Sequence, residues 1–370
     1  MKVMFAGGGT GGHIYPATAI ANFLKDKLND VEILFVGTEK GLESHLVPKE
    51  GFKLKTITVR GFKRNISLDL FISVKEMFQG TWQARNILRD FKPDIVIGTG
   101  GYVCGPVVFS AAVMGIPTLI HEQNVVPGIT NRILSRFVDG IAVSFEESVK
   151  YFPQNKNIKV TGNPIRHLIL KSDKYKALSN FRLSPTKKTV LVFGGSRGAR
   201  VINNAMVGFI IKNSEKTGLQ IIHITGRDEY EHFMKQLAMS GIELKEYGNI
   251  IIKPYIYNMQ DALAAADLVV SRAGAVTIAE ITALGKPSIL IPLRIAANNH
   301  QEYNARTLES SGASVIISEP QLSAESLHQT VWELLNKPSK LKMMGQKSKA
   351  LGKPRAVEDV FEFILHVLNH

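Results

Sequence analysis

Short apolar runs alternate with segments of helical character along the whole chain. The segment 3–13 has the pattern of an apolar strand, a glycine loop and the start of a helix, and the segment 191–200 has the same pattern. Strand–loop–helix alternation of this kind is typical of parallel sheets whose faces are covered by helices. The pattern therefore predicts an α/β protein.

Three such segments occur twice, in the same order and at similar spacing. The pairs are "VMFAGGGTGGH" (3–13) with "LVFGGSRGAR" (191–200), "PDIVIGTGGYV" (93–103) with "ADLVVSRAGAV" (266–276), and "MGIPTLIHEQN" (114–124) with "LGKPSILIPLR" (284–294). In the last pair, glycine ends a helix and proline precedes the next strand. We infer two Rossmann-like, doubly wound parallel-sheet domains in tandem, facing each other across a cleft.

The basic, proline-bounded segment 163–188 marks the change of domain. We expect an N-terminal domain over residues 1–164 and a C-terminal domain over residues 165–350. The final segment "KPRAVEDVFEFILHVLNH" predicts a helix that begins at Pro354. We expect this helix, within residues 353–370, to pack back on the N-terminal domain.

Residues 95–120 contain no charge and are numerous enough to span a bilayer as one helix. Glycine and proline interrupt this stretch repeatedly, as turns would. The interruptions are Gly98, Gly100, Gly101, Gly105, Pro106, Gly115 and Pro117. We therefore expect a buried strand, a glycine turn, a helix, a tight turn and a second buried strand, with a membrane-spanning helix as the alternative.

The composition is that of a globular protein, with 370 residues of which 45% are hydrophobic and 21% charged. Its single cysteine, Cys104, excludes an internal disulfide framework and a cysteine-rich zinc site. No basic and apolar leader precedes the first strand, so we expect a cytosolic protein. The net charge of +13 favours polyanionic partners such as phosphates, nucleic acid or anionic lipid. A solvated basic surface without a partner is the alternative.

The first glycine loop satisfies the G-x-G-x-x-G pattern with Gly7, Gly9 and Gly12, between a strand and a helix. Glycines at these positions let main-chain N–H groups approach a phosphate at the positive end of a helix. Tight packing of the strand on the helix is the alternative explanation. A dinucleotide-dependent oxidoreductase would also need an acid at the end of the second strand, and Glu39 meets that need only loosely.

The second glycine loop, residues 194–198, matches the G-x-S-x-G pattern of a hydrolase nucleophile. The remaining members of a triad would be Asp228, Asp261 or Asp267, followed by His300. The internal repeat explains the same loop without catalysis. We therefore favour a phosphate-binding turn in which the Ser196 hydroxyl donates, and a serine hydrolase is the alternative.

The segment "SRAGAVTIAEITALG" (271–285) predicts a small-residue turn that leads into a helix. Thr277 and the amides of Ala275 and Val276 would lie near the positive end of that helix. Glu280 shares a helix face with Thr277, and a carboxylate there suits the vicinal diol of a ribose. A capping box formed by Thr277 and Glu280 is the alternative. Metal-binding motifs are absent, so we expect arginines and main-chain N–H groups to hold anionic ligands, with no metal and no cofactor.

Seven short motifs lie in register along the chain. They are "GGGTGGHIYPA", "TGGYVCGP", "HEQNVVPG", "GNPIR", "GGSRGA", "RAGAVTIAE" and "NNHQEYNA". Together they resemble the bacterial undecaprenyl-diphospho-muramoylpentapeptide N-acetylglucosaminyltransferases, the MurG family. The resemblance implies a GT-B fold of two Rossmann-like domains. It also implies inverting transfer of N-acetylglucosamine from UDP-N-acetylglucosamine to the C4 hydroxyl of the muramoyl sugar of lipid I, which forms lipid II in peptidoglycan biosynthesis.

The resemblance also assigns roles by position. In the C-terminal domain, which would hold UDP-N-acetylglucosamine, Glu280 would bind the ribose hydroxyls and the Ile256 main chain the uracil edge. Ser196, Arg166 and the turn Ala275, Val276 and Thr277 would hold the diphosphate, and Gln301 the sugar hydroxyls. In the N-terminal domain, the glycine loops would bind the acceptor and its pyrophosphate through Gly9, Thr10, Gly11, Gly12, Thr99, Gly100 and Gly101. Asn124 would reach the donor sugar or the acceptor.

Inverting transfer needs a base for the acceptor hydroxyl and positive groups for the departing diphosphate. His13, at the exit of the first glycine loop, is the candidate base, and Glu122 is the second candidate. A histidine that packs the loop or binds the acceptor is the alternative for His13.

A lipid acceptor implies contact with a membrane, for which residues 60–89 are the candidate. Apolar residues recur there at three- and four-residue intervals beside basic ones; they are Leu70, Phe71, Val74, Met77, Phe78 and Trp82, with Arg60, Lys63, Arg64 and Lys75. Such a stripe is typical of a helix in the membrane interface, and a core-facing stripe is the alternative. We expect a peripheral protein at the cytoplasmic face of the membrane. We expect no nucleic-acid partner, because aromatic residues are not interleaved with the basic runs.

Overall fold

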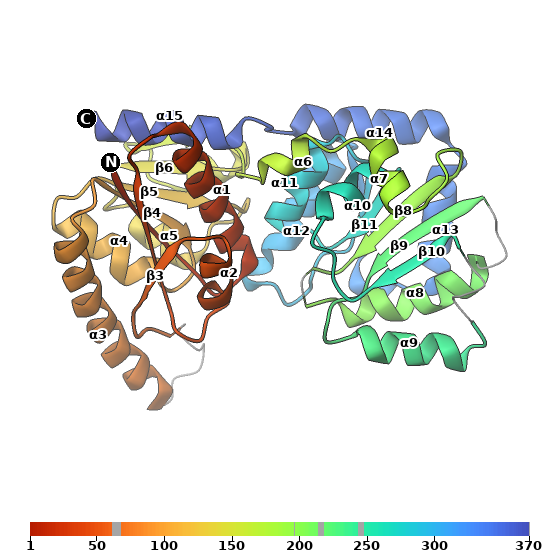
Figure 1. Cartoon of the computed structure of the whole chain (residues 1–370), viewed down its shortest axis with the longest axis horizontal. Coiled ribbons are helices and arrows are strands. Elements are labelled where there is room, and N and C mark those ends of the chain that lie inside the picture. Colours follow the sequence, from red (N-terminus) through yellow and green to blue (C-terminus); the bar gives the residue numbers. More distant parts are fainter. Residues whose placement is uncertain (61–67, 196, 214–217, 243–247, 370) are drawn as a thin grey trace. The chain divides into compact units, whose positions relative to one another are not determined.

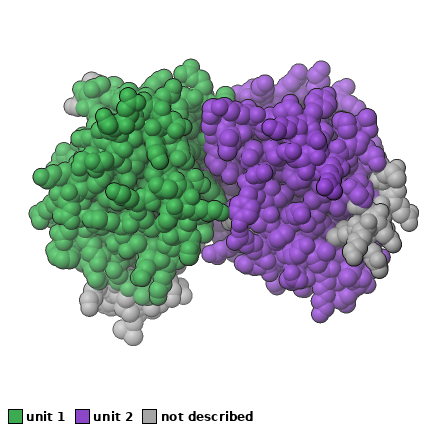
Figure 2. All heavy atoms as spheres, in the orientation of Figure 1, with its two compact units in different colours: residues 1–165, 353–370 green, residues 166–352 purple. Residues whose placement is uncertain are grey.

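The computed structural model describes residues 1–60, 68–195, 197–213, 218–242 and 248–369, and at residues 68–75 and 297 it describes the backbone alone. The chain divides into two compact units (Figures 1 and 2). Unit 1 comprises Met1–Ile165 and Lys353–His370, and unit 2 comprises Arg166–Gly352. The chain therefore leaves unit 1, builds unit 2, and returns to unit 1 with its last helix.

A seven-stranded parallel sheet forms the centre of unit 1, in the order β3-β2-β1-β4-β5-β6-β7. Its strands are β1 (Lys2–Gly7), β2 (Glu32–Gly37), β3 (Lys53–Thr56), β4 (Ile95–Gly100), β5 (Thr118–Glu122), β6 (Gly140–Val143) and β7 (Asn157–Val160). In β1, Met4 and Ala6 face one layer of helices while Val3 and Phe5 face the other. Burial on both faces explains why the central strands are continuous apolar runs in the sequence.

Helices cover both faces of this sheet (Figure 1). One face carries α3 (Leu68–Phe91), α4 (Cys104–Val113) and α5 (Ile129–Leu134), and the other carries α1 (Gly11–Lys27), α2 (Glu43–Lys49) and α15 (Ala356–Leu368). A short 3-10 helix, η1 (Glu146–Tyr151), precedes β7. Helix α15 begins two residues after the predicted Pro354. Its Phe363 and Val367 pack against β6 at Gly140, where a Cβ would lie 2.8 Å from Val367 Cγ2.

A six-stranded parallel sheet forms the centre of unit 2, in the order β10-β9-β8-β11-β12-β13. Its strands are β8 (Lys188–Phe193), β9 (Leu219–Ile224), β10 (Ile250–Lys253), β11 (Leu268–Ser271), β12 (Ser288–Leu290) and β13 (Ser314–Ile316). The helices are α6 (His167–Leu170), α7 (Lys174–Asn180), α8 (Arg200–Asn213), α9 (Tyr230–Met239), α10 (Met259–Ala265), α11 (Ala275–Ala283), α12 (His300–Ser310), α13 (Ala324–Leu335) and α14 (Pro338–Leu351), with the 3-10 helices η3 (Ala297–Asn299) and η4 (Glu319–Gln321).

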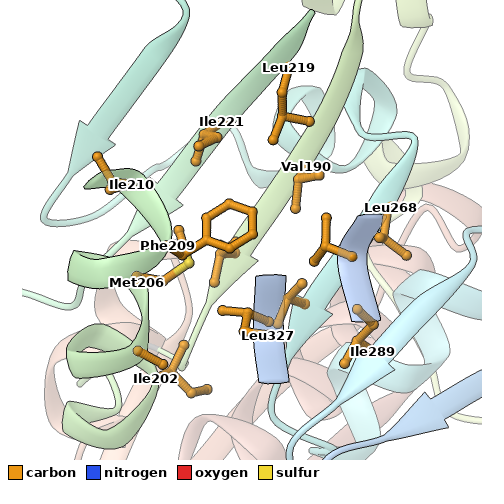
Figure 3. Close-up of a cluster of buried hydrophobic side chains, with 14 of the residues drawn as sticks. Val190, Ile202, Met206, Phe209, Ile210, Leu219, Ile221, Leu268, Ile289 and Leu327 are labelled. Atoms are coloured by element: carbon orange, nitrogen blue, oxygen red, sulfur yellow. The ribbon is translucent and has the colours of Figure 1, made fainter. Parts of the chain in front are cut away.

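A hydrophobic core of unit 2 lies on one face of this sheet. Met206 and Phe209 of α8 pack with Val190 and Ile221 of the sheet and with Leu327 of α13 (Figure 3). All five side chains are at most 1% exposed. Apolar burial on this scale dominates the stability of the unit and fixes the strands whose ends carry the site.

The internal repeats predicted from the sequence are confirmed element by element. Strand β1 and α1 correspond to β8 and α8, β4 and α4 to β11 and α11, and β5 to β12. The helix before the third strand of each set ends at a glycine with positive φ, +71° at Gly115 and +63° at Gly285. Side chains disfavour this left-handed conformation, so both turns require glycine. The prediction of two Rossmann-like parallel-sheet domains is confirmed.

The uncharged stretch 95–120 forms β4, α4 and β5, as the strand–turn–helix–turn–strand prediction requires. Within the described residues, no helix combines the length and the apolar character needed to cross a membrane. The membrane-spanning alternative for this stretch is therefore wrong.

Chain order reverses once in each sheet, between β1 and β4 in unit 1 and between β8 and β11 in unit 2. In doubly wound sheets, ligands bind outside the carboxyl ends of the strands at such a reversal. The first glycine loop follows β1, and the second follows β8. The topology therefore brings both glycine loops to the positions where a ligand site is expected.

Candidate active site

In unit 1, the residues predicted from the sequence gather at the carboxyl ends of three adjacent strands. Thr10 and His13 follow β1, Gly100 ends β4, and Glu122 ends β5. These strands are neighbours in the sheet although they are far apart in the chain. The sheet thus unites three separate motifs at one edge.

The pairing of β1 with β4 shifts by one residue at this edge. Ala6 pairs with Gly98, but Gly7 pairs with Gly100, so Thr99 is the extra residue. Thr99 is fully buried, and its carbonyl accepts a hydrogen bond from Gln123 Nε2 at 2.8 Å. Irregularities of this kind redirect a strand beside a functional site. The enclosed Thr99 side chain shapes the loop and does not face solvent.

The start of α1 presents N–H groups that find no acceptor among the residues that the structure describes. Thr10 is the N-cap residue, but its side chain makes no capping hydrogen bond, and its hydroxyl lies 3.4 Å from His13 Nδ1. Among the described residues, no hydrogen-bond acceptor faces the N–H groups of Gly11 and Gly12. The helix is 17 residues long, and its positive end favours an anion. This turn is suited to bind a phosphate.

Gly9 differs from Gly11 and Gly12 because its N–H group already donates a hydrogen bond within the protein. It donates to Glu43 Oε2 at 2.9 Å. Glu43 is fully buried, and its Oε1 accepts from the Thr38 N–H at 2.9 Å and from the Thr38 hydroxyl at 2.8 Å. A Cβ at Gly8 would lie 2.5 Å from Glu43 Oε1, so the loop needs glycine to close over this carboxylate. Glu43 therefore holds the first glycine loop in place, and the Gly9 amide serves that contact.

The second loop of unit 1, at the end of β4, lies directly against the first. The Gly8 N–H donates to the Gly100 carbonyl at 3.4 Å, and a Cβ at Gly101 would overlap the Gly8 carbonyl. Cys104 Sγ accepts from the Gly100 N–H at 3.0 Å and donates to the Ala6 carbonyl at 2.8 Å. Burial raises the pKa of the Cys104 thiol to about 12, so the thiol keeps the proton that it donates.

The His13 imidazole lies between the two loops and is half-buried. Its Nδ1 is 2.9 Å from the Gly8 carbonyl. A carbonyl only accepts, so in the neutral ring Nδ1 carries the proton and Nε2 keeps its lone pair. A Cβ at Gly100 would lie 2.7 Å from His13 Cδ2, so glycine is needed there for the ring to fit. This tautomer is the one that a general base acting through Nε2 requires.

Glu122 ends β5 with both carboxylate oxygens engaged. Oε1 accepts from the main-chain N–H of Asn124 at 3.0 Å and from its side-chain amide at 3.2 Å. Oε2 accepts from the Gly128 N–H at 3.1 Å and from Asn131 Nδ2 at 2.8 Å. The residue is 2% exposed. Four donors around a buried carboxylate favour a role in ordering this turn, and they orient the half-buried Asn124.

In unit 2, Arg166 and Glu280 lie together although 114 residues separate them. Arg166 Nη2 is 3.4 Å from Glu280 Oε1. Glu280 is 6% exposed, and burial raises its pKa, an effect that the Arg166 guanidinium opposes. A buried carboxylate with a neighbouring guanidinium can accept hydrogen bonds from a hydroxylated ligand while Arg166 balances its charge.

Thr277 lies inside α11, whose N-cap residue is Gly274. A capping box with Glu280 would need the helix to begin after Thr277, whereas it begins at Ala275. The capping-box alternative is therefore wrong. The first-turn N–H groups of the helix belong to Ala275, Val276 and Thr277, the three residues predicted to bind a diphosphate.

Two further predicted residues of unit 2 lie on separate segments. Gln301 is in the first turn of α12, where its Oε1 accepts from the Leu293 N–H at 3.0 Å and its side-chain NH₂ keeps its donor capacity. Ile256 lies half-buried between β10 and α10. Its N–H and carbonyl form no hydrogen bond with any other residue that the structure describes. Its main chain can therefore pair with the edge of a planar ring.

Ser196 lies outside the described residues. Beside it, Gly198 packs on the main chain of Thr225, which a Cβ at Gly198 would overlap. Asp267, one candidate partner in the hydrolase alternative, precedes the amino end of β11 and accepts from the Thr189 N–H at 2.9 Å. Asp267 thus lies at the amino ends of the strands, whereas the described Gly194 and Gly195 follow the carboxyl end of β8.

Across the part of the chain that the structure describes, no three His, Cys, Asp or Glu side chains gather as they would around a metal ion. The groups that these sites offer to an anion are main-chain N–H groups in unit 1 and, in unit 2, such groups together with Arg166.

Sequence reasoning missed three residues that hold the unit 1 loops in place, namely Glu43, Cys104 and Tyr102. The Tyr102 ring lies over Gly9, 3.2 Å from where a Cβ would stand. Tyr102 follows Gly101 within a motif, so a signal for it was present. Glu43 stands among polar residues in "TEKGLESH", and its partner Gly9 is 34 residues away. Only the fold reveals that this carboxylate is buried.

Helix α3 carries the residues expected to meet a membrane. Phe78 and Trp82 are 69% and 67% exposed, and Met77 is half-buried. The core-facing alternative is therefore wrong for Phe78 and Trp82. Arg60 pairs with Glu76 at 3.1 Å. The other members of the predicted stripe lie outside the residues whose side chains are described; they are Lys63, Arg64, Leu70, Phe71, Val74 and Lys75.

Exposed apolar side chains continue from α3 onto the two helices that follow it on the same face of the sheet. Val113 at the end of α4 and Ile133 in α5 are each 59% exposed. Phe109 of α4 and Phe137 after α5 are 39% and 47% exposed and contact each other edge to face. Exposed apolar residues that extend over adjacent helices mark an interaction surface.

Two family models match most of the chain. Residues 3–143 match the glycosyltransferase family 28 N-terminal domain, and residues 189–360 match the glycosyltransferase family 28 C-terminal domain.

Curated relatives match over their whole length. A protein from Desulforamulus reducens is 54% identical over 368 residues, which cover 100% of this chain and 99% of the relative. A protein from Thermoanaerobacter sp. (strain X514) is 53% identical over 364 residues, which cover 98% of this chain and 99% of the relative. Both are named UDP-N-acetylglucosamine–N-acetylmuramyl-(pentapeptide) pyrophosphoryl-undecaprenol N-acetylglucosamine transferase.

Two solved structures resemble this chain over nearly its whole length. MurG of Acinetobacter baumannii matches with a TM-score of 0.77 and 28% identity, over 99% of both chains. The S. aureus MnaA structure with UDP matches with a TM-score of 0.70 at 14% identity, over 100% of this chain and 97% of that chain, which is a likeness of fold alone. These matches confirm the GT-B fold class. With full-length relatives above half identity and both domain models matched, the chain belongs to glycosyltransferase family 28, in the family of UDP-N-acetylglucosamine–N-acetylmuramyl-(pentapeptide) pyrophosphoryl-undecaprenol N-acetylglucosamine transferases.

Proposed function

We propose that this protein is an inverting glycosyltransferase that makes lipid II from lipid I. It transfers N-acetylglucosamine from UDP-N-acetylglucosamine to the C4 hydroxyl of the acceptor's N-acetylmuramyl sugar. The observation that carries the proposal is the full-length identity, above one half, to relatives named for this reaction. The groups at the carboxyl ends of the two sheets are suited to the reaction's steps.

His13 is the general base in this proposal. As the C4 oxygen attacks the anomeric carbon, its proton passes to His13 Nε2, and the bond from the anomeric carbon to the UDP oxygen breaks with UDP taking the electron pair. The hydrogen bond from Nδ1 to the Gly8 carbonyl, 2.9 Å long, supports this assignment because it fixes the required tautomer and persists in the imidazolium. Glu122, whose oxygens already accept four hydrogen bonds, is assigned to positioning Asn124.

The acceptor's pyrophosphate binds at the start of α1 and against the adjacent loop of β4. The N–H groups of Gly11 and Gly12 donate to it, together with the Thr10 hydroxyl. Gly9, Thr99, Gly100 and Gly101 give the two loops their shape, as the Glu43 and Cys104 contacts indicate. The bare backbone thus admits a doubly charged group close to His13.

The donor binds to unit 2. Glu280 accepts from the ribose hydroxyls, and Arg166, 3.4 Å away, balances its charge and lies where a diphosphate can reach it. The N–H groups of Ala275, Val276 and Thr277 neutralise the departing UDP. The remaining contacts follow the family pattern. The Ile256 main chain binds uracil, Gln301 binds the sugar hydroxyls, and Ser196 binds the diphosphate.

The acceptor's lipid directs unit 1 toward a membrane, so we assign the protein to the cytoplasmic face as a peripheral protein. Phe78 and Trp82 of α3, with Val113 and Ile133 beyond it, supply the apolar contact. Exposed Arg85 and Arg89 follow on the same helix and favour anionic headgroups.

A transfer assay tests the function. Purified protein is incubated with radiolabelled UDP-N-acetylglucosamine and a lipid I analogue, and labelled lipid is separated from free sugar nucleotide. We expect product only when both substrates are present, and we expect His13→Ala to lower kcat about 100-fold or more while UDP affinity changes little.

His45→Ala is the matched control, because His45 is an exposed histidine on α2. It should retain wild-type kcat. Absence of labelled lipid with the wild-type protein would refute the proposed function, whereas an unchanged kcat in His13→Ala would remove only His13 from the role of base.

A further inference from the structure

A second charged site lies in unit 2 at the amino ends of the strands, whereas the glycine loop lies at their carboxyl ends. A cavity of about 420 Å³ opens there beside the amino ends of β8, β11 and β12. It is lined by a face of α14, by the turn between α11 and β12, by Lys188 at the start of β8 and by the residues before β11. The volume is that of a small-molecule pocket.

Five lysines line this cavity and only one acid does. They are Lys174, Lys188, Lys286, Lys342 and Lys349, against Asp267. Asp267 lies 2.7 Å from Lys174 Nζ and 3.8 Å from Lys188 Nζ, and it also accepts from the Thr189 N–H. One carboxylate thus serves two lysines, and the cavity keeps an excess of four positive charges.

Lys286 contributes its charge from a constrained position. Its Nζ donates to the carbonyls of Ala264 and Ala266, at 2.9 and 2.8 Å. Burial and the nearby charge of Lys174 lower the pKa of Lys286 to about 8, while Asp267 acts in the opposite direction. Lys174 and Lys286 therefore repel one another, and a bound anion would relieve that repulsion.

The packing of α14 keeps the lysines close together. A Cβ at Gly285 would lie 2.9 Å from Lys349 Cβ, and a Cβ at Gly345 would lie 2.9 Å from the Gly285 carbonyl. Two glycines thus let the helix approach the α11–β12 turn, and they bring Lys342 and Lys349 of α14 to the cavity that also holds Lys286. The close approach of α14 to the α11–β12 turn thus groups these lysines, although Lys188, Lys342 and Lys349 themselves are exposed.

We propose that this cavity binds a small polyphosphate, a ligand of pyrophosphate or triphosphate charge, at a site separate from the one proposed for UDP-N-acetylglucosamine. The two sites lie at opposite edges of the same sheet, since the lysine cavity adjoins the amino ends of the strands and Glu280 and the α11 turn follow the carboxyl end of β11. Helix α11 runs between the two sites. Thr277 and Glu280 of the proposed donor site lie within the helix, and Leu284 and Lys286 of the lysine cavity follow its last residue.

Titration calorimetry with inorganic tripolyphosphate on the full chain tests the proposal. In about 20 mM salt, where screening is weak, we expect a dissociation constant of about 100 µM. The double variant Lys342→Gln/Lys349→Gln removes two charges from the cavity and keeps the aliphatic stem of Lys349 over Gly285. It should weaken tripolyphosphate binding about tenfold or more.

The matched control is Lys347→Gln/Lys350→Gln, which removes the same charge from exposed positions of the same helix that do not line the cavity. It should bind tripolyphosphate within about twofold of the wild type. Equal weakening in both double variants would mean non-specific attraction and overturn the proposal, as would absence of binding to the wild type at about 5 mM tripolyphosphate.

A vesicle arm distinguishes a free polyphosphate from a phospholipid headgroup. Phosphatidylglycerol vesicles are tested with the same variants in sedimentation. If Lys342→Gln/Lys349→Gln lost vesicle binding but bound tripolyphosphate as tightly as Lys347→Gln/Lys350→Gln does, the lysines would bind a membrane surface. That result would overturn the proposal. Unchanged vesicle binding with weakened tripolyphosphate binding supports it. Because the comparison is between two variants of α14, it does not depend on the transferase activity.

Discussion

Replacing Glu43 tests whether a buried carboxylate beneath the first glycine loop determines the shape of the acceptor site. Glu43→Gln keeps the volume of the side chain and changes only its charge and one of its two polar atoms. The amide oxygen can still accept from the Thr38 N–H and hydroxyl, which Oε1 accepts in the wild type. The amide nitrogen then replaces Oε2, and it presents hydrogens to the Gly9 N–H, which loses its acceptor.

The magnitude follows from the three hydrogen bonds that Glu43 accepts. A buried donor without an acceptor costs about 1–3 kcal/mol, and two hydrogen bonds to a charged acceptor become weaker neutral ones, so the decrease in unfolding free energy is about 3 kcal/mol. For a unit of this size, that corresponds to a melting temperature lower by about 6–12 °C. Because the Gly9 amide is where the loop is held, KM for the lipid acceptor should rise while UDP affinity remains that of the wild type.

Differential scanning calorimetry and acceptor titrations measure these two effects. Glu39→Gln, at an exposed glutamate near the end of β2, is the matched control and should change neither. If Glu43→Gln melts within about 1 °C of the wild type and keeps its acceptor KM, then the carboxylate does not hold the loop, and the reasoning from its hydrogen bonds is wrong.

Three further perturbations test other parts of the structure. Glu280→Gln should weaken UDP binding about 30-fold, measured by calorimetry, because ribose hydroxyls lose a charged acceptor worth about 2 kcal/mol. Phe78→Ser/Trp82→Ser should weaken sedimentation with anionic vesicles about tenfold or more, because two side chains exposed by 69% and 67% no longer enter the interface. Burial lowers the pKa of His121 and of His223 to about 4, so unfolding free energy should fall as the pH drops below about 6.5, by up to about 1.4 kcal/mol per pH unit for each histidine.

Each of these has a matched comparison. Glu302→Gln lies on α12 at a partly exposed carboxylate that pairs with Arg306, and it should leave UDP binding unchanged. Met239→Ser, 79% exposed on α9 of unit 2, should leave vesicle binding unchanged. The predicted change in unfolding free energy has a definite sign. Below pH 6.5 the two histidines are protonated in the unfolded chain, whereas in the folded protein their buried rings stay neutral until the pH approaches 4. Stability that is flat or rising between pH 6.5 and 4.5 would contradict it.

The fold could be predicted from the sequence because its signals are local and occur twice. Apolar strands buried on both faces, glycine loops after β1 and β8, and the glycine and proline that precede β5 and β12 are each readable within about a dozen residues. The positions of His13 and Gly100 in one site also follow, since adjacent parallel strands bring their carboxyl ends to the same edge.

The partners of the site residues could not be predicted, because they depend on contacts distant in the chain. Nothing near Glu43 in the sequence distinguishes it from the exposed Glu39, and its burial depends on Gly9. Thr277 and Glu280 have the spacing of a capping box, yet the helix starts at Ala275, a boundary that helix propensities specify only to within a few residues. Glu122 has the residue type of a base, and only the structure shows that Asn131 and Gly128 engage it.

The path of the chain also determines the order in which the protein can mature on the ribosome. The sheet of unit 1 is complete once β7 has been made, but α15, which buries Val360, Phe363 and Val367 against it, is translated only after unit 2. About 190 residues of unit 2 intervene, which at about 5–20 residues per second is a delay of about 10–40 s. During that interval the nascent unit 1 exposes the part of this apolar face that α15 later covers. Translation speed and chaperone access therefore matter more to the first half of this protein than to the second.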